Sequence, residues 1–585
     1  MVNPKDWRIY LALAIILLVV STVFSYAPYD YSTANYSNKK IGIEVSPLEF
    51  SPAGNFYGSQ SIKIILSNYG NSTLFSYITY GKSEIDRIAL LPNSSDIIYI
   101  QPNTKYNEIY FNGTEGNEHF NFSPRIHFIS PVIPITSDIL MLMIFPSYFM
   151  FLKYYPGRWR YGWISILIAY FLLSPFYGQR YDMYFAMTSP LRLLYGINPF
   201  IGNSHMPGGL KWAYPPLFLT FGVIYYYILH IFNINFYPTY TILVPSGFEY
   251  SAWRGFYNSS LPILYFLEKI PIVLSTFLIY FLFLRRFKLK YSRGELEKFW
   301  ILNPFIILIG SVWGQFDMVS LLFMILSILF FERKRTDLAI ISATTGAFIK
   351  IFPAILIPYI LLKSDRKMRD LLYVILISLI SIMFYVKAGN PLQDIEVLIY
   401  SRGVATVNGY FFANGITWQI IPMYLGVKHF PTFFPYLLIP IYFILLYLVK
   451  RLNLSIIEFS LIFLLSFFIF YNFVNPQYFV MIVSLFLLLE KRRYVILFSL
   501  VPSIYVLLNY SLPYFVNYYY SYNYFSSILG LGESLRLYLT DNIVAIGGFA
   551  LIATAAYILT FRDILLEIIS RNKSPDRVTP SSENI

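Results

Sequence analysis

Asp182 is the carboxylate that the sequence places best for chemistry, because it lies in a loop between two strongly apolar segments. The loop runs from Tyr177 to Phe218 and ends in Trp212, Tyr214 and two prolines. A carboxylate at the edge of a membrane protein can act as a general base that takes a proton from an acceptor hydroxyl. Arg180, two residues away, would keep the carboxylate ionised. The alternative is a helix N-cap or a solvated loop carboxylate.

Two cations are candidates for binding a phosphate group. Lys350 lies in the apolar run GAFIKIFPAILIP, in which Pro353 interrupts helical hydrogen bonding. A buried lysine there needs an anion, which a lipid phosphate would supply; the alternative is that its ammonium group snorkels to the interface. Arg402 lies in the loop YSRGVATVNGYFFANG. Its guanidinium can hold phosphate oxygens through two parallel hydrogen bonds, unless it is simply a solvated loop arginine.

A second carboxylate, Asp317, follows Gln315 in the sequence WGQFD, which separates two apolar segments. A charge at the centre of a membrane costs about 2.5–3.5 kcal/mol, so we predict a catalytic or structural role inside a cavity. The alternative is that Asp317 caps the returning helix of a hairpin. Gln477 and Tyr478 follow a similar break at Asn475–Pro476 and are secondary candidates for the same cavity.

Aromatic residues at the end of the Asp182 loop are candidates for contact with sugars. Trp212 and Tyr214 can stack on the apolar face of a pyranose, and so can Trp418. Anchoring at the membrane interface is the alternative for each of them, because Tyr and Phe each occur 54 times in the chain.

The composition indicates a polytopic, mostly helical membrane protein. Of the 585 residues, 57% are hydrophobic and 13% are charged, whereas soluble proteins carry about 25% charged residues. The net charge of +13 comes from short Lys and Arg clusters between apolar runs. That pattern is typical of cytoplasmic loops and not of a surface that binds nucleic acid.

Composition also limits the metal and thiol chemistry. The chain has no Cys, which excludes disulfides, thiolate metal sites and Cys nucleophiles. Its 5 His residues argue against a His-rich metal site. The Asp182 loop has no D-x-D pair, so the sequence leaves a divalent metal open without indicating one.

The N-terminal part combines one apolar segment with a β-rich region. Residues 8–26 are long enough to span a bilayer, and we predict an anchor because the run is too long for the core of a signal peptide. Residues 27–133 contain alternating runs such as Ser61–Leu66, which predict a small sandwich outside the membrane. Five N-x-S/T sequons favour a glycosylated surface there: Asn35, Asn71, Asn93, Asn112 and Asn121.

Membrane-spanning segments are predicted along the rest of the chain. The next ones are residues 134–152, 161–177, 217–232 and 261–284. The cluster Arg285–Lys298 predicts a cytoplasmic segment, but counting crossings from Phe218 then leaves one unaccounted for. Either residues 235–258 contain a re-entrant segment, or this cluster breaks the positive-inside rule.

From Phe299 onward the apolar pieces come in pairs, and each piece is short for a full span. Polar or Pro-containing interruptions separate the pieces: WGQFD, KIFP and NFVNPQ. Broken helices at membrane depth are tolerated where they line a cavity, so we expect the interruptions to converge on a cavity at the outer face. In total we predict about 12 to 14 spans.

The predicted organisation has four parts, with a last span at residues 543–560. They are an N-terminal anchor, an extracytoplasmic β-rich domain, a polytopic helical domain and a polar tail, at residues 1–26, 27–133, 134–564 and 565–585. The predicted location is the cell membrane, with the Asp182 loop on the extracytoplasmic face.

The order of the motifs resembles that of the integral-membrane glycosyltransferases of the GT-C superfamily. The motifs are G-I-N-P-F, W-A-Y-P-P-L, K-I-P, W-G-Q-F-D-M-V, F-I-K-I-F-P and V-N-P-Q-Y, spread over residues 155–490. The chain is most similar to the mannosyltransferase of GPI-anchor assembly, to the dolichyl-phosphate-glucose-dependent glucosyltransferases and to their prokaryotic relatives. The β-rich region lies outside the resemblance.

The resemblance implies a GT-C-like fold and an inverting hexosyltransferase. The donor would be a polyprenyl-phosphate-linked mannose or glucose, and the acceptor a glycan or glycolipid on the outer face. The acidic residue of the family's first outer loop falls on Asp182, as general base. Several relatives have a paired acidic motif where this chain has Asp-Met-Tyr. Lys350 and Arg402 would stabilise the departing phosphate, with the acceptor attacking from the opposite face.

Two other classes of function stay open. Broken helices and charges within the membrane also mark transporters, so a transporter or flippase of lipid-linked sugars is the alternative. The lack of an internal repeat and the long aromatic Asp182 loop argue against it. The third possibility is a non-catalytic scaffold for glycan or cell-envelope assembly.

Overall fold

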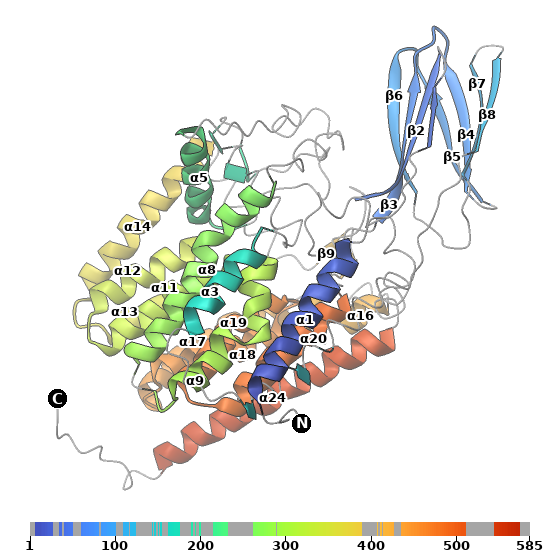
Figure 1. Ribbon diagram of the computed structural model, residues 1–585. Helices are drawn as coiled ribbons and strands as arrows, with labels where there is room; N and C mark the ends of the chain where they lie inside the picture. Colours follow the sequence, from blue (N-terminus) through green and yellow to red (C-terminus); the bar gives the residue numbers. More distant parts are fainter. Residues whose placement is uncertain are drawn as a thin grey trace.

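The computed structural model describes the strands and most of the apolar helices (Figure 1). The described residues are 6–26, 34–37, 40–50, 60–80, 83–100, 109–115, 118–123, 162–175, 198–200, 214–231, 261–287, 289–388, 406–407, 410–411, 413–425, 434–509 and 543–573, with isolated positions between 143 and 194.

The N-terminal β region consists of two four-stranded antiparallel sheets, ordered β1-β2-β3-β6 and β5-β4-β7-β8. Their strands are β1 Ala34–Ser37, β2 Ile41–Phe50, β3 Gln60–Asn68, β4 Leu74–Tyr80, β5 Ser83–Leu90, β6 Ser94–Ile100, β7 Ile109–Glu115 and β8 Glu118–Phe122. Alternate residues of both sheets point inward and share one core, which includes Ile43, Ile64, Leu74 and Phe111. The predicted β region is therefore confirmed, and its position outside the membrane stays a prediction.

The two sheets have a core separate from that of the helices, and Figure 1 shows them standing apart from the helical bundle. Of the predicted sequons, Asn71, Asn93, Asn112 and Asn121 have exposed side chains. Exposure is what a glycosylation acceptor needs.

The rest of the described chain is mostly helical. The helices are α1 Trp7–Tyr26, α3 Gly162–Leu173, α5 Leu219–Ile231, α8 Leu261–Arg285, α9 Arg293–Leu296, α10 Pro304–Ile307, α11 Asp317–Glu332, α12 Thr336–Ile349, α13 Leu356–Lys363, α14 Lys367–Ala388, α16 Ile420–Tyr424, α17 Leu438–Arg451, α18 Ile456–Phe470, α19 Phe479–Leu488, α20 Arg492–Asn509 and α24 Ile543–Lys573. Short 3-10 or π segments connect several of them: η2 Pro216–Phe218, η3 Glu297–Ile301, η4 Leu308–Trp313, η5 Phe352–Ile355, η6 Phe434–Leu437 and η7 Pro476–Tyr478.

Three of the described helices are long and apolar enough to cross a membrane: Tyr265–Arg285, Phe434–Arg451 and Gly547–Asn572. A fourth span results if Arg293–Ile301 and Pro304–Trp313, which meet at 50°, are counted as one. The described residues are thus compatible with a membrane protein, and most of their apolar helices are short. The predicted total of about 12 to 14 spans stays a prediction, because several predicted spans lie partly or wholly outside the described residues. Helix α24 also continues to Lys573, into the segment predicted to be a polar tail.

Proline accounts for the recurring helix breaks. Pro216, Pro304, Pro353 and Pro476 each lie in the first turn of a helical segment. Proline lacks an amide hydrogen and fits at a helix start, where that hydrogen would have no partner inside the helix. The predicted interruptions at KIFP and NFVNPQ are therefore confirmed as breaks at proline, and that at WGQFD is confirmed as a break without proline, at Gly314.

The turns richest in Lys and Arg lie at one end of the helical bundle, which we call the basic end. It comprises the turns at residues 286–287, 289–292, 333–335, 364–366 and 489–491, the end of α17 with Lys450 and Arg451, and the C-terminal end of α24. Ion pairs of 2.7 Å connect its parts: Arg492–Glu295, Lys491–Glu567 and Arg571–Glu458. The cluster Arg285–Lys298 thus lies at the same end of the bundle as the other basic turns, and its cytoplasmic position stays a prediction.

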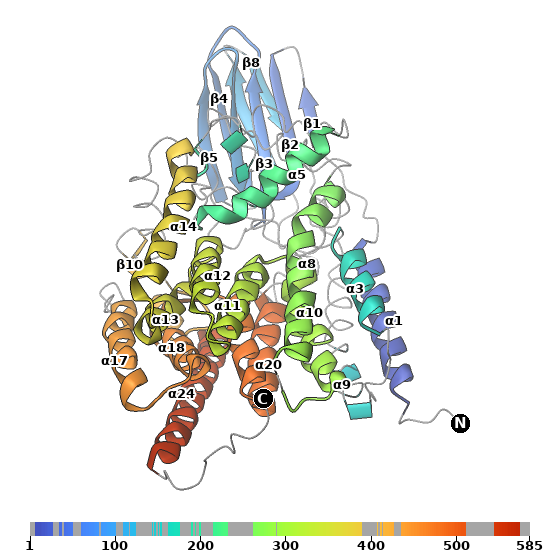
Figure 2. The same cartoon turned by 90° about the vertical axis from the view of Figure 1, so that its left-hand side faces the viewer.

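Helix α5 and the short segment η2 before it cover the apolar stretch that was predicted as a span at residues 217–232. Together they run from Pro216 to Ile231, which agrees with the predicted bounds, although the segment is shorter than the roughly 20 residues of a full span. Figure 2 shows α5 lying across the end of the bundle, above the ends of α8, α11 and α12, and not alongside α8. Whether this segment adds a crossing stays with the prediction made from the sequence. Residues 235–258 lie outside the described residues.

Candidate functional site

The buried ion pair between Lys350 and Asp317 is the centre of the candidate site. Lys350 Nζ donates a hydrogen bond to Asp317 Oδ2, and the two side chains are 4% and 0% exposed. Asp317 begins α11, and Lys350 follows the last residue of α12. Each charge therefore lies at the helix end whose dipole favours it. The pair closes the α11–α12 hairpin at the end opposite the basic end.

Three aromatic rings surround the ammonium group of Lys350. Its Nζ lies 5.1 Å from the ring centre of Tyr214, 5.0 Å from that of Phe316 and 5.3 Å from that of Tyr478. Ring faces attract a cation, and this attraction is stronger away from water. Tyr214 lies just before η2, Phe316 in the WGQFD turn and Tyr478 in η7. Three helix breaks therefore meet at Lys350.

Further ring contacts hold the breaks together. Tyr214 meets Phe316 edge to face at 4.9 Å, and Phe218 stacks on Phe316 at 4.5 Å. Phe352 packs against Tyr478 at 4.8 Å. The predicted convergence of the interruptions is therefore confirmed. The cavity predicted at this convergence stays a prediction, since long neighbouring loops lie outside the described residues.

The WGQFD turn depends on Gly314 and on Lys269. Gly314 has φ 80°, the left-handed region that favours glycine, and ends the π segment η4. Lys269 Nζ donates hydrogen bonds to the carbonyl oxygens of Ser174, Ser311 and Val312. Lys269 thus satisfies carbonyl groups at the ends of two helices, which gives the K-I-P motif a structural role.

A second tie holds the η7 break in place. Strands β11 Asn414–Gly415 and β12 Phe473–Val474 pair in parallel, and Trp418 Nε1 donates to the carbonyl oxygen of Ile469 at 2.8 Å. Gln419 Nε2 donates to the carbonyl oxygen of Phe470 at 2.7 Å. These bonds fix the chain just before η7 and thereby the position of Tyr478. Trp418, a predicted sugar-stacking candidate, instead serves this link.

The structure brings together some of the predicted site residues and does not describe others. Tyr214, Asp317, Lys350 and Tyr478 form one cluster, and Gln315 and Gln477 are buried beside members of it in sequence. The predicted residues Asp182, Trp212 and Arg402 lie outside the described residues.

The anion that Lys350 meets in the structure is Asp317, whereas the sequence analysis expected a lipid phosphate. A role of Lys350 toward a phosphate stays a prediction and requires that the phosphate share or replace this contact. Asp317 has its second carboxylate oxygen, Oδ1, buried without a hydrogen-bond partner among the described residues. Buried oxygens of this kind usually have a partner, so Oδ1 is available to a donor group on a ligand.

Sequence reasoning missed Phe316, Phe352 and Lys269. Phe316 is the fourth residue of WGQFD and Phe352 the third of KIFP, so the motifs contain them, but an aromatic residue in an apolar chain carries no signal of its own. Lys269 had one signal, a lysine at the start of an apolar segment. Within the parts of the chain that the structure describes, no group of three or more acidic or His residues is arranged to hold a metal ion.

The comparisons with known proteins found no match. No family model matches the chain, and no curated protein matches it either. The function is therefore argued from the motifs and the geometry.

Replacing Gly314 by Ala is expected to lower the free energy of unfolding by about 1–3 kcal/mol or more, because a residue with a side chain is strained at this φ. A Cβ there would also lie 2.5 Å from Lys269 Cε. Thermal unfolding in detergent measures the effect. Gly548→Ala is the matched control, since a Cβ at Gly548 meets nothing within 4 Å. Equal stability of the two variants would contradict the role assigned to Gly314.

Proposed function

We propose that the protein is a membrane glycosyltransferase of the GT-C type. It transfers a hexose, mannose or glucose, from a polyprenyl-phosphate-linked donor to a glycan or glycolipid acceptor on the outer face. Asp182 acts as general base, and the sugar is inverted at the anomeric carbon. Lys350 and Arg402 stabilise the phosphate that departs.

The observation that carries the proposal is the buried Asp317–Lys350 pair within the WGQFD and FIKIFP motifs. An intramembrane ion pair is costly and needs a reason to be retained. The pair lies where the loop that carries Asp182 re-enters the bundle, because Tyr214 from the end of that loop packs on Lys350 and Phe316. This arrangement supports a site in which the Asp182 loop closes over the helix breaks.

The proposed chemistry needs no separate acid. The acceptor hydroxyl loses its proton to Asp182 as its oxygen bonds to the anomeric carbon, and the bond from that carbon to the phosphate oxygen breaks. The phosphate leaves as an anion, and the cations stabilise its charge. A closed loop that excludes water would prevent hydrolysis of the donor.

The test is transfer of labelled hexose by the purified full-length protein, using polyprenyl-phosphate-mannose and polyprenyl-phosphate-glucose as donors and membrane glycolipids as acceptors. We expect transfer from one donor, also when a chelator is present. A parallel assay follows movement of the labelled donor between the leaflets of vesicles. Lipid movement without any transfer would instead identify a transporter or flippase, and absence of both would favour a scaffold.

A further inference from the structure

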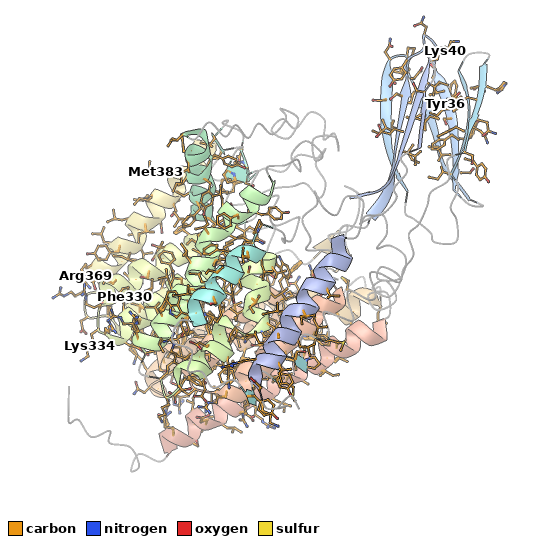
Figure 3. All side chains as sticks on the ribbon, in the orientation of Figure 1. Tyr36, Lys40, Phe330, Lys334, Arg369 and Met383 are labelled. Carbon is orange, nitrogen blue, oxygen red and sulfur yellow. The ribbon has the colours of Figure 1, made fainter. Side chains whose placement is uncertain are left out.

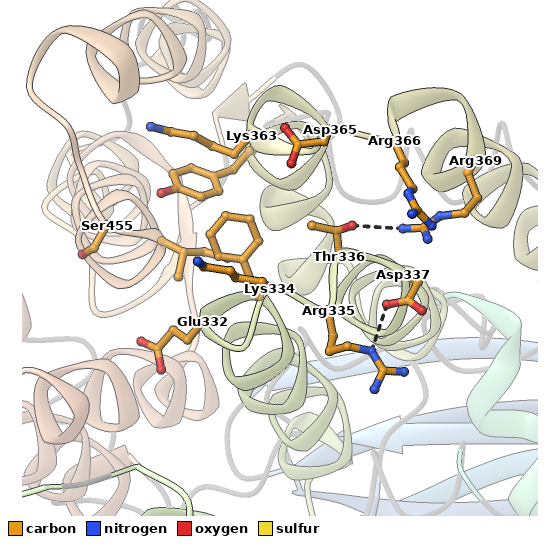
Figure 4. Close-up of a pocket in the computed structure, with 13 residues that line it drawn as sticks. Glu332, Lys334, Arg335, Thr336, Asp337, Lys363, Asp365, Arg366, Arg369 and Ser455 are labelled. Carbon is orange, nitrogen blue, oxygen red and sulfur yellow. Dashed lines mark hydrogen bonds and ion pairs between the residues drawn. The ribbon is translucent and has the colours of Figure 1, made fainter. Parts of the chain in front are cut away.

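A pocket of about 780 Å³ lies at the basic end, far from the Asp317–Lys350 pair (Figure 4). We call it the basic pocket. Its walls are the α11–α12 turn, the α13–α14 turn and the start of α18. The lining residues are Phe331, Glu332, Lys334, Arg335, Thr336, Asp337, Tyr359, Lys363, Asp365, Arg366, Arg369, Ser455 and Ile456.

Cations outnumber carboxylates in the basic pocket, with five of the former and three of the latter. Arg335 pairs with Asp337 at 3.5 Å, and Arg369 with Asp370 at 2.8 Å. Lys334, Lys363 and Arg366 form no ion pair within the described chain, because no described carboxylate lies within 4.0 Å of their charged groups. Unpaired cations around a cavity attract an anion.

The cations reach the pocket from two sides. Figure 4 shows the side chains of Lys334 and Lys363 extending toward Ser455, and those of Arg366 and Arg369 on the other side. Arg369 Nη2 donates a hydrogen bond to Thr336 Oγ1 at 3.1 Å, which holds that arginine at the pocket wall. An anion between the two sides can therefore contact both lysine and arginine groups.

One wall of the pocket is apolar. Phe331 and Tyr359 pack edge to face at 5.4 Å, and Ile456 is buried beside them in the pocket lining. The Tyr359 hydroxyl donates a hydrogen bond to the carbonyl oxygen of Leu454 at 2.8 Å, so its polar group is satisfied within the protein. A small inorganic ion gains nothing from contact with an apolar wall. Burying the glycerol and upper acyl atoms of a lipid against it is favourable.

The pocket borders an exposed apolar surface. Helix α14 starts at the pocket and exposes a continuous apolar stripe, in which Met368 is 79% exposed and Leu372 is 51% exposed. The stripe continues at Leu371, Ile375 and Leu379. Figure 3 shows Arg369 and Met383 toward opposite ends of this helix. An exposed apolar stripe of this kind is a surface that acyl chains can cover.

We propose that the basic pocket binds the headgroup of an anionic phospholipid from the adjacent leaflet. The lipid phosphate lies among Lys334, Lys363 and Arg366, its glycerol part contacts Phe331 and Tyr359, and its acyl chains follow the apolar stripe of α14. Basic pockets between membrane helices bind lipid headgroups by this combination of charge and apolar contact. The site is independent of the proposed glycosyl transfer, because it lies at the other end of the helices.

The test is retention of lipid by the full-length protein purified in detergent, measured by native mass spectrometry with phosphatidylglycerol and with phosphatidylcholine. The pocket variant combines Lys334→Gln, Lys363→Gln and Arg366→Gln. The matched control combines Arg333→Gln, Lys367→Gln and Lys450→Gln, which are exposed at the same end, lie outside the pocket and change the net charge equally. Inorganic phosphate and glycerol phosphate are added as soluble competitors.

We expect the wild type and the control to retain phosphatidylglycerol in preference to phosphatidylcholine. The pocket variant should bind phosphatidylglycerol about 10- to 100-fold more weakly, from the contribution of three cations to contact with an anionic lipid. Equal weakening of both variants, equal retention of the two lipids, or full displacement by the soluble competitors would each overturn the proposal. The charge-keeping variant Lys334→Arg with Lys363→Arg should keep binding, which separates loss of charge from misfolding.

Discussion

Asp182→Asn is expected to reduce hexose transfer from the polyprenyl-phosphate donor by about 10²–10⁴-fold, the usual contribution of a general base. Asparagine keeps the size of the side chain but cannot accept the proton of the acceptor hydroxyl. The reduction should appear in the turnover rate and leave donor binding nearly unchanged, since Asp182 is assigned to the acceptor. The measurement is the initial rate of labelled hexose transfer at saturating donor.

Asp394→Asn is the control for this prediction, because Asp394 is a carboxylate eight residues before Arg402 to which no role is assigned. It should transfer hexose at the wild-type rate. Equal transfer by wild type and Asp182→Asn would remove Asp182 from catalysis. The buried Asp317 would then be the next candidate for the base, and Asp317→Asn the next variant to measure.

Lys350→Met is expected to lower the free energy of unfolding by about 3–5 kcal/mol, because it leaves the Asp317 carboxylate buried without its partner. Replacing both members of the pair, as Lys350→Met with Asp317→Leu, should restore most of this loss, since two apolar side chains leave no charge to solvate. Thermal unfolding in detergent compares the three proteins. Lys367→Met, at an exposed position that starts α14, should stay within about 0.5 kcal/mol of wild type.

The double variant also separates a structural role from a catalytic one. If the pair only holds the α11–α12 hairpin closed, the double variant should regain transfer together with stability. If Lys350 also stabilises the departing phosphate, the double variant should be stable and yet strongly reduced in transfer. A Lys350→Met variant as stable as wild type would contradict the buried ion pair itself.

The apolar helices and most of their breaks could be predicted because they depend on local chemistry. Pro353 and Pro476 interrupt helical hydrogen bonding wherever the chain goes, and these breaks fall where the sequence placed them, whereas the break before Pro304 was not predicted. Gly314 likewise marks a turn that other residues avoid. The alternation of apolar residues in the β region has the same local origin, since successive side chains of a strand point to opposite faces.

The number and position of the spans could be predicted only in part. Hydrophobicity shows how apolar a segment is but not how its helix is oriented relative to the other helices. The apolar segment at residues 217–232 was predicted to be a span on its hydrophobicity alone. In the structure α5 lies across the end of the bundle, an orientation that apolarity alone does not give. The basic cluster Arg285–Lys298 lies beside the start of α20, because Arg492 pairs with Glu295.

By itself, the sequence determined that this protein is built from apolar helices with breaks at set places and has a separate β region at its N-terminal side. It also determined that WGQFD and FIKIFP contain charges unusual for a membrane. Only the tertiary structure decided that these two charges, 33 residues apart, neutralise each other inside a ring of aromatic side chains, and that five other cations surround a pocket at the basic end. The physical reason is that the cost of burying a charge depends on which group comes to lie beside it, and folding brings that group from a distant part of the chain.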